Sequence, residues 1–249
     1  MTSPVKKGYR IVFLATLIFG IYFETIIFFY IQSNKISELL LKDFKVIVAL
    51  KNQPDIEKIT SQISQIIGIK QVKYIKSEES IKKIENEDKE LYLSIKSMSL
   101  NPVPDIITLD IDPAFMGNIN SIVDKVSTIN GVSDIRYKPD EIIAIMHTIF
   151  YSKFLFLVIG ATVVIISMTF LLAIIQVGAS NFFTSLVESF KWFLNGMFGS
   201  VVSIIFVYII IYPTKYISPL WEWPCALWHL IILLSGGIMG WVLHQWKKN

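Results

Sequence analysis

Hydrophobic positions gather in four long runs along the chain: residues 11–31, 154–177, 193–212 and 226–246. Each run is long enough to cross the hydrocarbon core of a bilayer, which is about 30 Å thick. The first run follows a basic cluster and contains one charged residue, Glu24. A cleaved signal peptide is the competing interpretation, but the run is long for a signal core, and Gln32-Ser33-Asn34-Lys35 is a poor cleavage site. We therefore expect four membrane-spanning helices.

Basic residues at the two ends of the chain indicate one orientation. Lys6, Lys7 and Arg10 precede the first run, and Lys247 and Lys248 follow the last. Because basic flanks stay on the cytoplasmic side, both termini are predicted to be cytoplasmic. The predicted segments are a cytoplasmic N-terminus (1–10), transmembrane helix 1 (11–31), an extracytoplasmic domain (32–153), transmembrane helix 2 (154–177), a short cytoplasmic loop (178–192), transmembrane helix 3 (193–212), a short external loop (213–225), transmembrane helix 4 (226–246) and a cytoplasmic tail (247–249).

The segment between the first two runs alternates between strand and helix patterns. Residues rich in β-branched side chains predict strands at 43–50, 72–75, 106–111 and 132–137. Apolar residues at helical spacing predict helices at 55–67, from 77 onward and at 119–129. Asp55 and Ser77 are the expected N-caps of the first two, and Gly68 suits the end of the first.

The resulting order, β-α-β-α-β-α-β, predicts a ferredoxin-like (split βαβ) extracytoplasmic domain with an extra helical segment between strands two and three. The fold class is therefore α+β, with this domain inserted between spans 1 and 2 of a four-helix transmembrane domain. A further helix is expected from Pro139 through Lys153 into the second span, because no Gly or Pro lies between Asp140 and Val158. Such a continuous helix would act as a stiff lever, which is a hypothesis at this stage.

Composition supports a membrane protein with one polar module. The chain is 53% hydrophobic with a net charge of +3, and 33 of its 43 charged residues lie between residues 32 and 153. Its mean hydropathy is +0.55, too apolar for one soluble domain. Because the charges of the module are nearly balanced in sign, we interpret them as a solvated surface and expect no nucleic-acid partner. Cys225 is the single cysteine, which excludes an intramolecular disulfide or a cysteine-based zinc cluster.

No catalytic or cofactor motif occurs in the sequence. Walker A, H-E-x-x-H, G-x-S-x-G and G-x-G-x-x-G patterns are all missing, so we expect no catalytic residue, no metal site and no cofactor. His147, His229 and His244 are isolated and are interpreted as packed or interfacial residues. Glu24 lies inside a span, where an acid is costly. We favour a snorkelling or helix-paired carboxylate over a proton relay, and both remain open.

Glycines in the last two runs indicate close helix packing. Gly236 and Gly240 form a G-x-x-x-G pattern, and Gly196 and Gly199 lie on the preceding run. Small residues allow two helix backbones to approach closely. The contact could lie within the bundle or in a dimer.

Five short motifs, in order, resemble those of the FtsX family, the permease-like subunit of the bacterial cell-division ABC complex. The motifs are Val72-Lys73-Tyr74-Ile75 with Ser77-Glu78-Glu79, Asn101-Pro102-Val103-Pro104-Asp105, Gly131-Val132-Ser133-Asp134-Ile135-Arg136-Tyr137, Val177-Gly178-Ala179-Ser180-Asn181, and the run from Phe190 to Gly199. The second is similar to the family's N-P-L-P-x hallmark, so Asn101, Pro102 and Pro104 match it. Gly178 and Ala179 match the family's V-G-A-[ST]-[ND].

The resemblance implies a non-enzymatic transducer in the bacterial plasma (inner) membrane, at the division site. An FtsE-like cytoplasmic ATPase would drive a homodimer of the chain, whose extracytoplasmic domain would activate a peptidoglycan hydrolase or its coiled-coil activator. The family's partner-binding lobe maps to about residues 85–100. Its apolar face would consist of Tyr92, Leu93, Ile95, Met98 and Leu100. Alternatively, these residues merely cover the sheet.

One departure concerns the cytoplasmic coupling segment. Family members carry a stretch of the type N-T-I-R-L … R-R-x-E-I before V-G-A; here Met168 and Leu171 replace its Asn and Arg, and the basic stretch is missing. The residues left for contact with an ATPase are Ser180, Phe182, Glu188 and Lys191. Either a shortened coupling element survives in 182–192, or the chain has lost its motor and serves as an anchor or scaffold for cell-wall enzymes. A transport permease is disfavoured because the spans contain few polar residues.

Overall fold

The computed structural model describes residues 4–51, 54–98, 102–218 and 220–248. The chain divides into two compact units. Unit 1 comprises Met1–Ser37 and Thr148–Asn249, and unit 2 comprises Glu38–His147. The polar module of the sequence therefore folds as a body of its own, and the apolar runs form the other.

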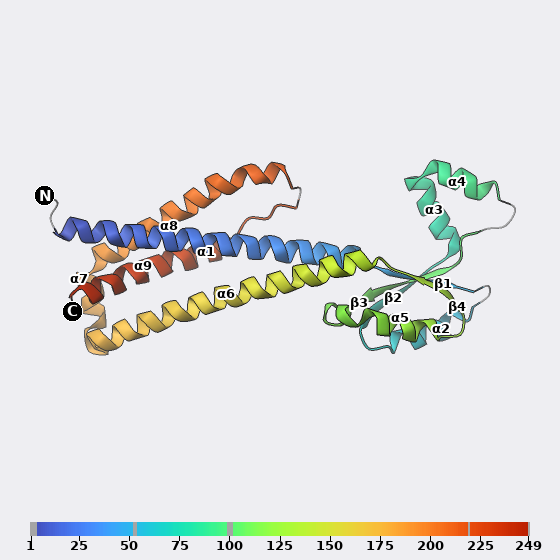
Figure 1. The fold of residues 1–249 in the computed structure, drawn as a ribbon, viewed down its shortest axis with the longest axis horizontal. Helices are drawn as coiled ribbons and strands as arrows, with labels where there is room; N and C mark the ends of the chain where they lie inside the picture. Colours follow the sequence, from blue (N-terminus) through green and yellow to red (C-terminus); the bar gives the residue numbers. More distant parts are fainter. Residues whose placement is uncertain (1–3, 52–53, 99–101, 219, 249) are drawn as a thin grey trace. The chain divides into compact units, whose positions relative to one another are not determined.

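Unit 1 is helical, and its helices are longer than the apolar runs within them (Figure 1). The elements are α1 (Pro4–Asp43), α6 (Pro139–Val177), the 3₁₀ turn η2 (Ala179–Asn181), α7 (Phe182–Glu188), α8 (Phe190–Ile211), the 3₁₀ turn η3 (Tyr212–Tyr216) and α9 (Ala226–Lys248). Four of these segments are long and apolar enough to cross a membrane: Gly8–Asp43, Pro139–Val177, Phe190–Tyr216 and Ala226–Lys248. The helix expected from Pro139 into the second span is confirmed as α6.

Small residues bring α8 and α9 into close contact. A methyl group added at Gly196 would overlap the carbonyl of Gly236 and meet the Cα of Gly240 at 3.1 Å. Only glycine fits such a backbone-to-backbone contact. The glycine pattern read from the sequence therefore acts within the bundle. Two turns further along α8, Ser203 lies against Gly20 of α1.

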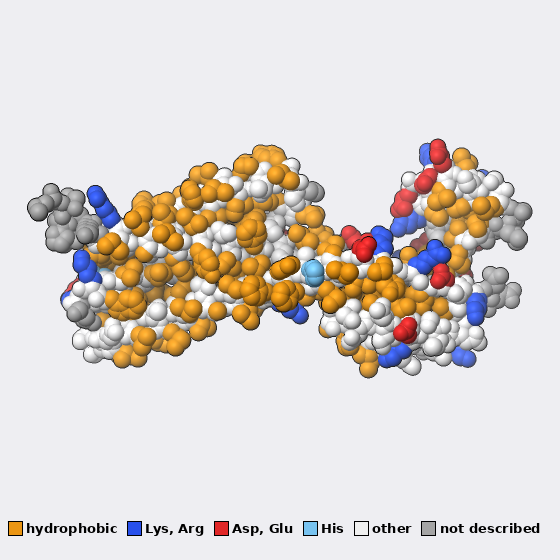
Figure 2. Space-filling model, viewed as in Figure 1, with side chains coloured by type: hydrophobic (Ala, Val, Ile, Leu, Met, Phe, Trp, Pro, Cys, Tyr) orange, Lys and Arg blue, Asp and Glu red, His pale blue; other side chains and the backbone are white. Residues whose placement is uncertain are grey.

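Exposed side chains of unit 1 are mostly apolar, as Figure 2 shows. Along α6, Leu157, Ile165 and Ile175 are exposed, and no charged residue occurs between residues 154 and 177. Such a surface is unusual for a water-soluble protein and suits lipid. The charged side chains gather on unit 2 instead.

Unit 2 is built on a four-stranded sheet. Its strands are β1 (Val46–Leu50), β2 (Ile69–Ile75), β3 (Ile106–Ile111) and β4 (Val132–Arg136), in the order β2-β3-β1-β4 with antiparallel neighbours. Alternate residues of β1 and β3 are buried because successive strand side chains point to opposite faces. Helices α2 (Ile56–Ser64) and α5 (Ile119–Ser127), with the 3₁₀ turn η1 (Pro113–Asn118), cover the buried face. Their buried residues include Ile59, Ile63, Met116, Ile122 and Val126.

Of the three helix-end residues predicted in unit 2, one is confirmed. Asp55 is the N-cap of α2 and accepts a hydrogen bond from the Lys58 amide (3.2 Å). The prediction for Ser77 was wrong: it is the first residue of its helix, the N-cap is Lys76, and no side chain of the cap residue closes that end. Gly68 does not end α2, which stops at Ser64; with φ +100° it forms the turn into β2. Only glycine adopts this left-handed conformation readily.

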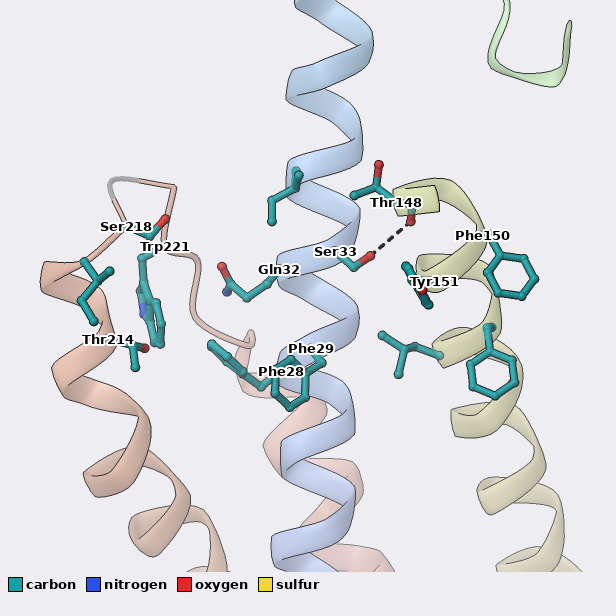
Figure 3. A pocket seen from close by; sticks show the side chains of 14 residues that line it. Phe28, Phe29, Gln32, Ser33, Thr148, Phe150, Tyr151, Thr214, Ser218 and Trp221 are labelled. Atoms are coloured by element: carbon teal, nitrogen blue, oxygen red, sulfur yellow. Dashed lines mark hydrogen bonds between the residues drawn. The ribbon is translucent and has the colours of Figure 1, made fainter. Parts of the chain in front are cut away.

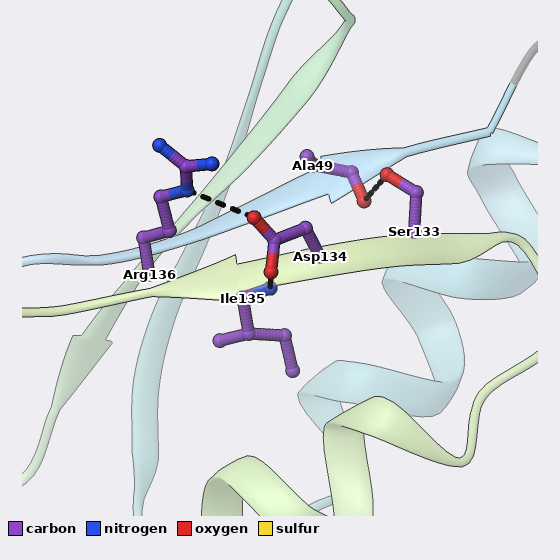
Figure 4. Close-up of polar contacts among 5 residues, drawn as sticks. All are labelled: Ala49, Ser133, Asp134, Ile135 and Arg136. Carbon is purple, nitrogen blue, oxygen red and sulfur yellow. Dashed lines mark hydrogen bonds and ion pairs between the residues drawn. The ribbon is translucent and has the colours of Figure 1, made fainter.

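Strand β4 is an edge strand, with one side-chain hydrogen bond to β1 and two within the strand (Figure 4). The Ser133 hydroxyl donates to the Ala49 carbonyl (3.1 Å) beside an irregularity in the β1–β4 register. Asp134 accepts hydrogen bonds from the Arg136 Nε (2.8 Å) and from the Ile135 amide (2.9 Å). The bond from Arg136, and secondly that from the Ile135 amide, lower the pKa of Asp134.

Candidate functional site

The lobe inserted between β2 and β3 consists of two short helices, α3 (Ser77–Glu87) and α4 (Lys89–Lys96). They pack against each other, and neither contains a buried residue. Asp88 ends α3 and caps α4, because its carboxylate accepts a hydrogen bond from the Leu91 amide (3.0 Å). An element without a core of its own is a poor source of stability but is well suited to offer a surface.

The predicted partner-binding residues do not form one exposed face. Leu93 is 63% exposed and Met98 is exposed, whereas Tyr92 and Ile95 are half-buried. Leu93 and Ile95 are two positions apart, so they point to opposite sides of the helix. The ammonium of Lys96 lies 5.7 Å from the centre of the Tyr92 ring. Leu100 and Asn101, also predicted site residues, lie outside the described residues.

Leu91 is an exposed apolar residue of α4 that the predicted set omitted. It lies four positions before Ile95, on the same side of the helix. The i, i+4 spacing was present in the sequence and could have identified it. Leu91 and Leu93 together give α4 apolar atoms on both sides.

Asp105 fastens the base of the lobe. Its carboxylate accepts hydrogen bonds from the Tyr74 hydroxyl (2.6 Å) and from the Ser77 amide (2.8 Å), so it joins the start of β3 to the end of β2 and the beginning of α3. Asp105 thus accepts from the N-terminal turn of α3, a role that an N-cap side chain usually has and that the N-cap residue Lys76 does not fill. Pro102 and Pro104, exposed residues of the predicted motif, precede it.

The titration of this pair follows from the hydrogen bonds. The bond from Tyr74 is the largest cause that lowers the pKa of Asp105, followed by that from the Ser77 amide. The same bond raises the pKa of Tyr74 to about 12. At neutral pH the Asp105 carboxylate is therefore ionised and the Tyr74 hydroxyl is protonated, so the hydrogen bond is made to a charged group.

The predicted coupling loop contains ordered helical structure. Gly178, with φ +84°, ends α6, and its amide donates to the Ile174 carbonyl (2.9 Å). Ala179 begins η2, and α7 follows. Of the predicted coupling residues, Ser180, Glu188 and Lys191 are exposed, whereas Phe182 is half-buried.

Helix α7 is anchored to α9 at both ends. Phe182 packs against Trp241, with 5.5 Å between ring centroids. At the other end, the buried Ser189 hydroxyl lies 2.8 Å from Nδ1 of His244. It also accepts a hydrogen bond from the side-chain Nε2 of Gln245 (3.1 Å). Glu188 lies 3.5 Å from Lys248. The start of α1, the end of α9 and α7 lie at the same end of unit 1 (Figure 1).

Two large apolar residues of α7 are left uncovered. Phe183 and Val187 are 75% and 76% exposed. They are spaced i, i+4 and so share one side of the helix. The sequence contained this signal, but the predicted set named only their neighbours.

At the opposite end of unit 1, a cavity of about 940 Å³ opens between α1, α6 and the segment that follows α8 (Figure 3). Its walls include the rings of Phe28, Phe150, Phe154 and Trp221. The Ser33 hydroxyl donates to the Thr148 carbonyl (3.2 Å) across it. No charged side chain lines the part of this cavity that the structure describes.

Within the described ranges, no group of three or more His, Cys, Asp or Glu residues is arranged to hold a metal ion.

Comparison with known proteins gives a match for unit 2. Residues 43–147 match the family model described as the FtsX extracellular domain, which confirms the resemblance for the three motifs that lie in this range. A crystal structure of extracellular domain 1 of FtsX from S. pneumoniae in complex with undecyl-maltoside shows 15% identity and a TM-score of 0.31, covering 37% of this chain and 92% of that one. A solution structure of the large extracellular loop of FtsX from Streptococcus pneumoniae shows 17% identity and a TM-score of 0.31, covering 39% and 100%. No curated protein matches the chain.

Proposed function

Because residues 43–147 match the model of the FtsX extracellular domain, we propose that the chain is an FtsX-like membrane subunit of a cell-division ABC complex. In this proposal it transmits an ATPase-driven change to the extracellular domain, which activates a peptidoglycan hydrolase or its coiled-coil activator. The observation that carries the proposal is the family match together with four helices able to cross a membrane. The chain itself performs no catalysis, and a homodimer is the working assembly.

The α3–α4 lobe is the proposed partner site. It exposes Leu91, Leu93 and Met98 and buries none of its own residues, so an apolar helix of a partner could cover these side chains. Leu93→Asp should reduce binding of the hydrolase or activator at least tenfold. Ile67→Asp is the matched control, because Ile67 is 76% exposed and lies outside the lobe, in the turn before β2. Equal binding by both variants would remove the lobe from consideration.

Helix α7 is the proposed contact for an FtsE-like ATPase. It would serve in place of the longer coupling segment that FtsX family members carry. Phe183 and Val187 supply an apolar surface, and the contacts of Phe182 and Ser189 with α9 fix its position. A double variant Phe183→Asp, Val187→Asp should abolish ATP-dependent co-purification with the ATPase. Leu220→Asp, at an exposed apolar position of the α8–α9 segment, is the control.

A motor-independent anchor or scaffold is the alternative function, supported by the missing basic stretch before Gly178. Co-purification with each candidate ATPase of the same genome distinguishes the two. Complex formation that depends on ATP supports the transducer. Retained hydrolase binding without any ATPase complex supports the scaffold.

The proposed topology places both termini in the cytoplasm and unit 2 outside. Cys225 offers a direct test, because it is the single cysteine and is exposed in the segment between α8 and α9. A membrane-impermeant maleimide should label Cys225 in intact cells, or in spheroplasts if a second membrane surrounds the cell. Labelling only after lysis would reverse the orientation.

The topology of unit 2 supports its assignment as a ferredoxin-like (split βαβ) module. Strands β1 and β2 are connected through α2, and β3 lies between them in the sheet. Strands β3 and β4 are connected through α5, and β1 lies between them. The lobe is then the extra segment of this module between β2 and β3.

A further inference from the structure

Glu24 is the only Asp, Glu, Lys or Arg within the four apolar runs, and it is fully buried. Full burial excludes a snorkelling carboxylate. Instead, Glu24 Oε1 lies 3.5 Å from Nδ1 of His229 on α9. Along α1, Glu24 lies about 21 Å from Arg10 and about 12 Å from Gln32 at 1.5 Å per residue, which places it well inside a hydrocarbon core.

His229 connects the carboxyl group to a third helix. Its Nε2 lies 2.7 Å from the hydroxyl of Tyr208 on α8. The Tyr208 ring stacks on Trp223, with 4.5 Å between ring centroids. A carboxyl, an imidazole and a phenol thus form one polar chain that joins α1, α9 and α8.

The Glu24 end of this polar chain is surrounded by apolar side chains. Both Glu24 oxygens are buried and lack a hydrogen-bond partner in the part of the chain that the structure describes. The neighbouring side chains Phe23, Ile27, Ile159 and Ile232 form an apolar cluster, and Ile159 is the contribution of α6. The α8–α9 segment contains two charged residues, Lys215 and Glu222, and Glu222 lies 3.3 Å from Lys35.

An ionised carboxylate without hydrogen bonds is strongly disfavoured in such a place unless a positive charge lies beside it. We propose that Glu24, His229 and Tyr208 form a proton-binding site in which one proton is shared between the Glu24 carboxyl and the His229 imidazole. The proton resides either on the carboxyl beside a neutral imidazole or on the imidazole beside a carboxylate. In both forms the pair has no net charge, and α1 stays packed against α8 and α9.

The proton reaches the site from the side of the α8–α9 segment. Tyr208 lies one turn before the end of α8, and His229 lies in the first turn of α9. The His229 side chain is 24% exposed, whereas that of Glu24 is 1% exposed. Loss of the proton leaves a buried negative charge and loosens α1, the helix that continues to Asp43 at the start of the extracellular domain.

The test is the pH dependence of unfolding of the full-length protein in detergent or nanodiscs. Free Glu and His side chains lose their protons near pH 4.3 and 6.5, so above pH 6.5 the unfolded chain holds no proton at these two residues while the folded chain holds one. The unfolding equilibrium constant of the wild type should therefore rise by about tenfold per pH unit above pH 6.5. Glu24→Gln should remove this rise, and Glu222→Gln, which alters an exposed acid, should retain it.

Spectroscopy identifies the carrier of the proton. At pH 7 the wild type should show either an infrared band of a protonated carboxyl that is absent from Glu24→Gln, or the nitrogen NMR signature of an imidazolium at His229. In His229→Phe the proton must reside on Glu24, so the carboxyl band should be present. A carboxylate beside a neutral imidazole at pH 7, or an unchanged pH dependence in Glu24→Gln, would overturn the proposal. If Glu24→Gln fails to fold, the proposal is tested by the histidine NMR spectra of the wild type and by the carboxyl infrared band of His229→Phe.

Discussion

The hydrogen bonds at the base of the lobe give a quantitative prediction. Asp105 accepts from the Tyr74 hydroxyl and the Ser77 amide, and a hydrogen bond to a charged group contributes about 1.5–3 kcal/mol. Because Asp105 is only half-buried, solvent screening places each bond at or slightly below the low end of that range. We expect Tyr74→Phe to cost about 1–1.5 kcal/mol and Asp105→Ala about 2–3 kcal/mol of local stability.

Hydrogen–deuterium exchange on the full-length protein measures this effect, because it reports local opening. A change of 1.4 kcal/mol is tenfold in an equilibrium constant. Tyr74→Phe should therefore speed exchange in the first turn of α3 and at the start of β3 about five- to tenfold, and Asp105→Ala about 30- to 150-fold. Tyr92→Phe is the matched control, since it removes a hydroxyl from the lobe but not from its base. Exchange in Asp105→Ala within twofold of the wild type would refute this reasoning.

The same connection depends on pH at both ends of the scale. The folded pKa of Asp105 is lowered, so its stabilisation is present above the unfolded pKa of about 3.9 and is lost as the pH falls through the folded value. The folded pKa of Tyr74 is raised to about 12, so its stabilisation is complete below about pH 10 and is lost as the pH rises towards 12. Protection from exchange, taken relative to an unstructured chain at the same pH, should fall in both windows in the wild type. Asp105→Ala should lack both changes in protection.

Further predictions concern glycines in unit 1. Gly178→Ala places a side chain at φ +84° and should lower the stability of the α6–α7 junction by about 1–2 kcal/mol. Gly160→Ala is the control, because a methyl group added at this position of α6 meets nothing within 4 Å. This variant should be neutral or more stable than the wild type by up to about 1 kcal/mol. Thermal unfolding in detergent compares the two, and equal midpoints would contradict the prediction. Gly196→Val should push α8 away from α9, because Gly196 faces the Gly236 backbone. It should lower the midpoint of thermal unfolding more than Gly178→Ala does. A midpoint equal to that of the wild type would contradict this prediction.

Local patterns were sufficient for much of the architecture. Segments rich in β-branched residues predicted the strands, because such side chains pack well on a pleated sheet. Long apolar runs gave the candidate spans, and the N-cap at Asp55 followed from residues adjacent in sequence. Five motifs in order indicated the family resemblance, and the match over residues 43–147 confirmed it for the three motifs within that range.

Contacts between distant residues needed the tertiary structure. Ser77 looked like an N-cap, yet the amide at that end is satisfied by Asp105, 28 residues away. The lobe residues Tyr92 and Leu93 looked equivalent in sequence, but one is half-buried and the other exposed. Glu24, His229 and Tyr208 lie on three helices; His229 looked isolated in sequence, and Tyr208 was not singled out. Short-range preferences determine which elements form, whereas packing between elements determines which polar groups meet, and no single stretch of sequence contains that information.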